Sequence, residues 1–112
     1  MANVIDLSKY NLSVNKKKQA KHILELGYIT GRSILTADPE TLIKLYSGRG
    51  RPYISEKEGI WNNKEWFSHS EIIGIWKSSD GQENKQTTNG IIHYSPDNGV
   101  HIVPARPDLP VD

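Results

Sequence analysis

The sequence predicts a single α+β domain. Two helix patterns come first, around residues 16–26 and 38–48, and strand patterns follow from residue 64 onward. Helices followed by a run of strands, instead of strands alternating with helices, indicate an α+β arrangement with an antiparallel sheet. A length of 112 residues suits one domain with one modest hydrophobic core.

Composition and charge exclude several classes of protein. There is no cysteine, which excludes disulfides and thiolate metal sites. No apolar run approaches the roughly 20 residues of a membrane span, and the first twelve residues show no signal-peptide pattern. Residues 1–56 carry nine Lys/Arg against five Asp/Glu, and residues 57–112 carry five against eight. The basic first half of the chain can bind phosphate, but the whole chain is too neutral for strong non-specific binding to nucleic acid.

Capping residues and glycines mark the helices. Asn15 can cap a first helix, and Asp38 followed by proline suits the start of a second one. Gly27 and Gly48 are the expected stops. The apolar residues of the second helix that should be buried are Leu42, Ile43, Leu45 and Tyr46. We expect an N-terminal arm at 1–14, the domain at 15–107 and a short tail at 108–112.

The second half of the chain predicts a loop and then strands. Residues 47–63 are rich in glycine, proline and charge and should form a loop. Residues 71–77 are apolar on both faces, as in a central strand, and the polar segment 82–88 suits an edge strand after an Asp-Gly turn. Residues 91–95 and 100–105 are the last two strands. His69 is expected to be structural. The three tryptophans, Trp61, Trp66 and Trp76, are expected in the core, although Trp61 could instead stack on a base.

The last hairpin carries the most informative pattern. Residues 97–99 predict a three-residue loop whose glycine adopts the left-handed conformation. This loop would pair Ser95 with His101 and His93 with Val103. Both histidines and Ser95 then share one face, while the four alternate residues, all apolar, share the other. A one-residue slip would bury a histidine among core residues at a cost of several kcal/mol, so the first register is favoured.

Two histidines on one face can serve as general base and general acid. The imidazole pKa lies near neutrality, so one ring can be neutral while the other is charged. On RNA, a base takes the proton of the ribose 2′-OH, the oxygen attacks phosphorus, and an acid protonates the leaving 5′-oxygen. Nearby Lys or Arg can neutralise charge on the phosphate, and Ser95 can orient a histidine. The alternative is two ordinary histidines on a solvated sheet face.

Several motifs together resemble the polymorphic toxin type 50 domain, a family of bacterial toxins regarded as RNases. They are Lys-Gln-Ala-Lys-His-Ile at 18–23, Gly-Arg-Ser-Ile-Leu at 31–35, Asp-Pro at 38–39, Ile-His-Tyr-Ser at 92–95 and Gly-Val-His-Ile-Val-Pro-Ala at 99–105. The resemblance runs from residue 15 to 107. It implies N-terminal helices packed on a curved antiparallel sheet of about four strands, as in barnase, EndoU, colicin and RelE. It also implies catalysis without metal or cofactor.

The resemblance also implies a set of site residues at the matching positions. The catalytic set is His22, Arg32, Thr88, His93, Ser95 and His101. Candidate RNA phosphate contacts from our reading of the basic residues are Lys18, Lys21, Arg49 and Arg51. The ordinary alternatives are a solvated helix face for Lys18 and Lys21, an ion pair for Arg32, and an exposed position on an edge strand for Thr88. The spacing of the four histidines matches no familiar metal-ligand pattern, so no metal is expected.

The leading hypothesis is therefore a metal-independent endoribonuclease toxin that uses histidine acid–base catalysis. Its expected partners are RNA, a cognate immunity protein, and the larger secreted or phage-associated protein that carries the domain at its C-terminal end. Its expected place of action is the cytoplasm of a target bacterium, with no membrane partner. Two alternatives remain: a non-catalytic phage-associated structural or binding module of the same fold, and a different RNA-processing or nucleotide-modifying enzyme using the same cleft.

Overall fold

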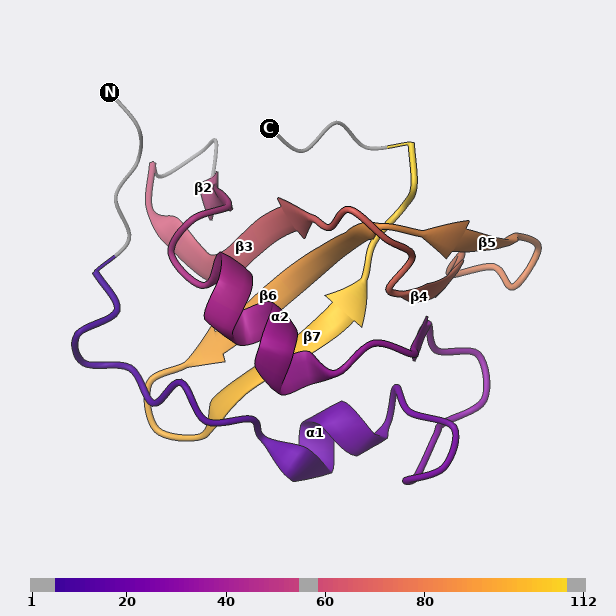
Figure 1. The fold of residues 1–112 in the computed structure, drawn as a ribbon, viewed down its shortest axis with the longest axis horizontal. Coiled ribbons are helices and arrows are strands. Elements are labelled where there is room, and N and C mark those ends of the chain that lie inside the picture. The colour runs from indigo at the N-terminus through magenta and orange to yellow at the C-terminus, as the bar shows by residue number, and fades with distance from the viewer. Residues whose placement is uncertain (1–5, 55–58, 109–112) are drawn as a thin grey trace.

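Two antiparallel sheets and two short helices make up the described part of the protein (Figure 1). The computed structural model describes residues 6–54 and 59–108. The four-stranded sheet has the order β2-β3-β6-β7, with β2 at Arg51–Ile54, β3 at Trp61–Ser68, β6 at Asn89–Ser95 and β7 at Gly99–Pro104. The three-stranded sheet has the order β1-β4-β5, with β1 at Ile34–Leu35, β4 at Gly74–Lys77 and β5 at Asn84–Thr87. The helices are α1 at Lys16–Ala20 and α2 at Pro39–Tyr46.

The protein is mostly β, so the predicted α+β fold, with N-terminal helices packed on one sheet as in barnase or RelE, is wrong. Helix α1 has five residues and α2 has eight, whereas the first helix was expected to reach residue 26. Two backbone carbonyls explain the early end of α1. Lys21 O accepts from Ile29 N at 3.1 Å, and His22 O accepts from Leu35 N at 2.7 Å. Because these carbonyls bind later parts of the chain, they do not extend the helix.

Helix α2 confirms its sequence prediction in most details. The side chain of Asp38 accepts a hydrogen bond from Thr41 N at 3.2 Å, and a proline occupies the first turn. Leu42 and Ile43 are buried, whereas Leu45 is 43% exposed and does not belong to the core. The helix lies across one face of the four-stranded sheet (Figure 1), where it closes the hydrophobic core.

The predicted strands are largely confirmed. Strand β4 is the middle strand of its sheet, β5 lies at the edge, and the turn between them contains Gly81 at φ 75°. The exception is the predicted loop at 47–63, which contains β2 and the first residues of β3. Strand β2 is an edge strand with exposed, polar and proline positions, so its sequence lacks the apolar alternation that identifies a strand.

The last hairpin has the predicted faces but a different register. Gly99 pairs with Ser95, so the loop is 96–98, and His93 lies directly opposite His101. The predicted pairing of Ser95 with His101 is therefore wrong. Because the offset is two residues, each side chain stays on its predicted face. Gly99 has φ 86°, and a Cβ there would lie 2.4 Å from Ser13 O, so this turn requires glycine.

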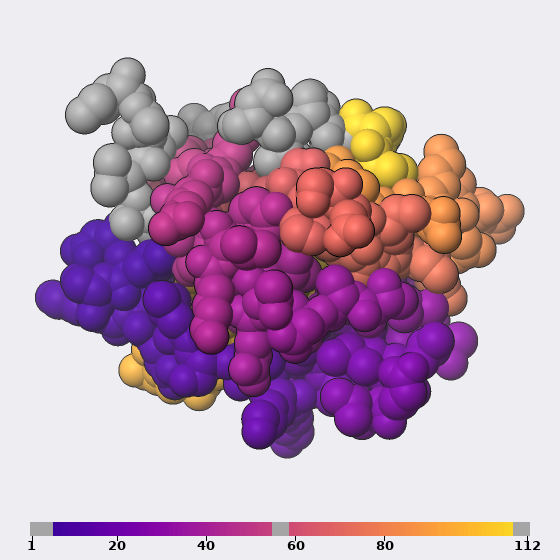
Figure 2. All heavy atoms as spheres, in the orientation of Figure 1, coloured from indigo at the N-terminus to yellow at the C-terminus, as the bar shows by residue number. Residues whose placement is uncertain are grey.

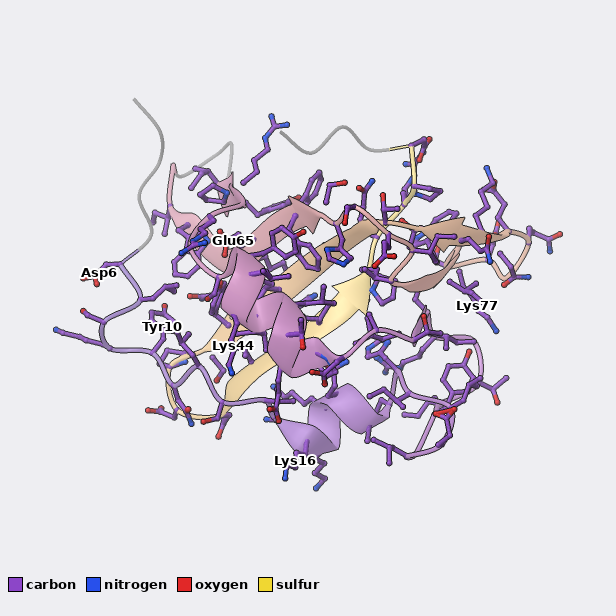
Figure 3. All side chains as sticks on the ribbon, in the orientation of Figure 1. Asp6, Tyr10, Lys16, Lys44, Glu65 and Lys77 are labelled. Atoms are coloured by element: carbon purple, nitrogen blue, oxygen red, sulfur yellow. The ribbon has the colours of Figure 1, made fainter. Side chains whose placement is uncertain are left out.

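The buried carboxylate of Glu65 fixes which side chains of β3 face the core. Glu65 is fully buried and accepts hydrogen bonds from Gly48 N at 2.9 Å, Gly50 N at 2.6 Å and the Tyr94 hydroxyl. Figure 3 shows it beside the C-terminal end of α2. Burial and the bond to this carboxylate raise the pKa of Tyr94. With Glu65 turned to the core, its neighbours Lys64 and Trp66 must point to the opposite face of the sheet.

The N-terminal segment and α1 cover the edge of β7 that faces away from β6. Val14 forms a parallel bridge with Val100, and Asn15 N donates to Val100 O at 2.7 Å. Farther along the edge, Gln19 Nε2 donates to Ile102 O at 2.9 Å, and its Oε1 accepts from Ile102 N at 2.7 Å. The side-chain amide thus makes the two bonds that a further strand would make. An edge covered in this way is protected from pairing with another chain.

The described part of the predicted arm is packed on the domain. Leu7, Tyr10 and Val14 are partly buried against the core. Figure 2 shows the N-terminal segment beside the part of the chain that contains α2. The first five residues of the arm and the predicted tail from residue 109 lie outside the described residues.

Replacing Gln19 with alanine should lower the free energy of unfolding by about 1–3 kcal/mol, because it leaves a buried N–H and C=O of Ile102 unpaired. Denaturant unfolding measures this. Gln86→Ala on exposed β5 is the matched control and should change stability by less than about 0.5 kcal/mol. Equal effects of the two substitutions would show that the Gln19 bonds do not hold α1.

Candidate active site

The face of the four-stranded sheet that turns away from α2, called the outer face below, carries four of the predicted site residues: Arg51, His93, Ser95 and His101. Its side chains follow from the register: Arg51, Trp66, Ile91 and Val103 form one row across the sheet, and Lys64, His93 and His101 form the next. Their sequence neighbours Glu65, Ile92 and Ile102 are buried on the core side. Every residue of the two rows is exposed or half-buried. This face is therefore the accessible side of the sheet.

Three histidine rings stack across the outer face and the adjacent α1 segment. The rings of His93 and His101 are 4.7 Å apart between centroids, with 20° between their planes. The ring of His22 lies 6.2 Å from that of His101 at 18°. Gln19 holds α1 on β7, and the hydrogen bond between His22 Nδ1 and Ser33 O, at 2.9 Å, orients the third ring. The structure thus brings His22 to two histidines that lie more than 70 residues later in the sequence.

Burial and positive charge keep the two strand histidines neutral. Burial is the main cause that lowers the pKa of His93 to about 4, and the charge of Lys64 adds to it. Burial likewise lowers the pKa of His101 to about 3, with further contributions from His93 and His22. At neutral pH both imidazoles are unprotonated, so both can accept a proton.

The pKa of His22 is also lowered, but by less than those of His93 and His101. Burial lowers its pKa, the hydrogen bond to Ser33 O opposes this, and the charges of Arg32 and Lys21 lower it further. The ring is 5% exposed. It is therefore better suited to support the neighbouring His101 than to touch a large ligand.

Four cationic side chains lie within electrostatic reach of the stack: Lys18, Lys21, Arg32 and Lys64. Their charges are those that lower the histidine pKa values. Among residues 6–54 and 59–108, none of the four takes part in an ion pair. A group of cations without carboxylate partners attracts an anion, and a phosphate diester is an anion of suitable size.

The other predicted site residues fall into two groups. Ser95 and Arg51 lie on the outer face with the histidines, Ser95 two residues beyond His93 on the same strand. Thr88 lies five residues before His93, about 17 Å away along an extended strand. Arg49 is exposed in the connection between α2 and β2, with no described contact to the stack. The structure therefore does not bring these last two residues to the histidines.

Sequence reasoning missed Lys64, Tyr53 and the outer-face position of Trp66. Trp66 was expected in the core, but it is half-buried on the outer face, and its Nε1 has no hydrogen-bond partner in the described chain. The pairing of Lys64 with His93 depends on strand register, which residue patterns do not reveal. The period of two in residues 61–68 was the available signal. Trp61 packs against the core as predicted, and His69 bonds to Tyr46 Oη at 2.7 Å.

Comparison with known families identifies the family of the chain. The model of the family Bacterial toxin 50 matches residues 14–104, which include all three stacked histidines. The chain belongs to this family. The toxin domain has no match among curated proteins. Membership of a toxin family points in general to a larger toxin protein and to an immunity partner. Within the described part of the toxin domain, no helix has the length and apolar character to cross a membrane, and no three ligand-type side chains are placed to hold a metal ion.

Nuclear magnetic resonance titration of the imidazole rings tests the electrostatics of the stack. In the free toxin domain, His93 and His101 should titrate at pKa values of about 4 and about 3. Lys64→Gln should raise the pKa of His93, because it removes a positive charge directly opposite the ring. Lys44→Gln, on α2, is the control and should leave it unchanged. Titration of both rings near the ordinary value of about 6.5 would contradict this account.

Proposed function

We propose that the toxin domain is a metal-independent endoribonuclease in which His93 and His101 share acid–base catalysis. The observation that supports this is the pair of directly opposed imidazoles, 4.7 Å apart, surrounded by cations that have no ion-pair partner in the described chain. Neutral imidazoles can accept a proton, and unpaired lysines can bind the phosphate that carries the reaction. Family membership supports the toxin role.

The reaction uses the ribose itself as nucleophile. One imidazole accepts the proton of the 2′-OH while this oxygen forms a bond to the adjacent phosphorus. The bond from phosphorus to the 5′-oxygen breaks, and the second imidazole, in its protonated form, donates a proton to that oxygen. The products are a 2′,3′-cyclic phosphate and a free 5′-OH end. Since RNA supplies the nucleophile, the proposal requires no cofactor and no activated serine.

Substrate phosphate can restore the proton that the general acid needs. In the free domain a pKa of about 4 leaves His93 neutral at pH 7. A phosphodiester charge about 4 Å away, at an effective dielectric constant of about 20, stabilises an imidazolium by about 4 kcal/mol. That energy corresponds to about three pKa units, which brings the value near neutrality. The same attraction acts on both rings, so His93 and His101 share the roles of general acid and general base.

The surrounding residues bind and position the phosphate in this proposal. Lys18, Lys21 and Arg32 approach from α1 and the segment after it, and Lys64 approaches from β3. The ring of His22 stacks on that of His101 and positions it. Ser95 lies at the end of the outer face. An immunity protein that blocks this cationic site would present acidic residues to it. A larger secreted or phage-associated protein would deliver the domain to the cytoplasm of a target bacterium.

Expression in bacteria tests the nuclease proposal directly. The wild-type domain should arrest growth and degrade cellular RNA, and purified protein should cleave RNA equally well with EDTA present. His93→Ala and His101→Ala should each lower the cleavage rate by about 10²- to 10⁴-fold, because each removes one proton-transfer group. His69→Gln, which alters a structural histidine bonded to Tyr46, is the control and should retain activity.

Three outcomes would contradict the proposal. Intact RNA with folded wild-type protein would favour a non-catalytic binding module. Loss of cleavage in EDTA would indicate metal-dependent chemistry. Full activity of both histidine variants would place catalysis elsewhere on the domain.

The pH dependence of cleavage follows from the low histidine pKa values. A general acid works only when protonated, and in the free enzyme His93 loses its proton above a pKa of about 4 and His101 above a pKa of about 3. The ratio kcat/KM reports the free enzyme, so it should fall about tenfold per pH unit from about pH 5.5 to about pH 7.5. The dependence of kcat should be shallower, because bound phosphate raises the pKa. A kcat/KM profile that peaks near pH 7 would argue against these assignments.

A further inference from the structure

Two aromatic rings lie together on the outer face beside the histidines. The rings of Tyr53 and Trp66 are 5.6 Å apart between centroids, with 50° between their planes. Tyr53 is 42% exposed, and neither residue belongs to the hydrophobic core. The register of β2 shifts between Pro52 and Ile54, which sets Tyr53 apart from the regular ladder. An accessible aromatic pair of this kind contributes little to the core and is available to a ligand.

The aromatic pair is continuous with the histidine pair. Trp66 pairs with Ile91, two residues before His93, so Trp66 and His93 are diagonal neighbours on one face, at about 7–8 Å. Lys64 lies between the two groups: its Nζ is 5.9 Å from the Tyr53 ring centre, and its charge lowers the pKa of His93. Arg51 extends the same row on the far side of Trp66 and is exposed.

We propose that Tyr53 and Trp66 form a stacking subsite for an unpaired nucleobase next to the phosphate held at the histidines. This inference rests on the proposed function, since it takes RNA as the ligand. Bases stack on aromatic side chains, and cations beside those rings bind the backbone, which is how single strands are bound without a base-pair code. The bases of a duplex are already stacked on one another and cannot enter such a subsite. The substrate class is therefore single-stranded RNA.

The subsite is tested by binding, independently of cleavage. The probe is a short single-stranded deoxyoligonucleotide, which lacks the 2′-OH and is not cleaved by the proposed reaction. Its comparison is an oligonucleotide of the same length and charge made of abasic residues. Binding of each probe is followed by the fluorescence anisotropy of a dye attached to it, and stacking on Trp66 is followed by tryptophan fluorescence. Tyr53→Ala should weaken binding of the base-containing probe by roughly 5- to 100-fold and leave the abasic probe unchanged. Tyr53→Phe, which keeps the ring, should bind within about twofold of wild type.

A second variant pair keeps the test valid if Tyr53→Ala fails to fold. Trp66→Phe should remove most of the fluorescence change caused by the base-containing probe. Trp76→Phe, on the other sheet beside Arg106, is the matched control and should keep that change. The two substitutions alter the same type of side chain, so the difference reports position alone.

The outcomes separate this inference from the nuclease proposal. Equal binding of base-containing and abasic probes by the wild type would overturn the subsite, whether or not RNA is cleaved. So would a Tyr53→Ala loss of the same size for both probes, or no binding of either, as expected for a surface that meets a protein instead. Base-dependent binding without RNA cleavage would support the subsite while the nuclease proposal fails.

Discussion

The pair of hydrogen bonds between the Gln19 side chain and the backbone of Ile102 is the interaction on which the candidate site depends. It fastens a five-residue helix, too short to be stable by itself, to the edge of β7. That attachment sets His22 beside His101 and places Lys18 and Lys21 within electrostatic reach of the histidines. The same bonds occupy an edge that would otherwise pair with another chain. Edge protection and assembly of the site are therefore one structural feature.

The sheet supplies the other half of the site through a buried carboxylate. Glu65 satisfies its lone pairs with two backbone N–H groups and a tyrosine hydroxyl, so it stays on the core side. The alternation of β3 then presents Lys64 and Trp66 on the outer face, opposite His93 and Ile91. Burial lowers the pKa of His93, and the charge of Lys64 beside it lowers that pKa further. In the proposed function, an anionic phosphate binds beside this cation and the two imidazoles.

Sequence patterns identified the parts of this protein that depend on local chemistry. The caps of α2, the glycine turn at 99 and the faces of the last hairpin follow from propensity and alternation, and the structure has them. The first helix was overestimated, because its apolar spacing is helical while tertiary hydrogen bonds at Lys21 and His22 end it. Strand β2 was predicted as a loop, since its sequence, which includes an arginine and a proline, lacks the apolar alternation of a strand. The three-stranded sheet depends on the pairing of β1 with β4, 40 residues apart in register, which no local signal reports.

By itself the sequence determined that His93, Ser95 and His101 share a face, because a strand alternates with a period of two and only one alternation buries apolar residues. It also indicated, by resemblance, the toxin family that the comparison with known families shows. Only the tertiary structure decided that His93 and His101 are directly opposed, that Lys64 faces His93, and that His22 completes the stack. These contacts depend on strand register and on the docking of α1. Strand register and the docking of α1 are both set by long-range hydrogen bonds, which produce no periodic pattern in the sequence.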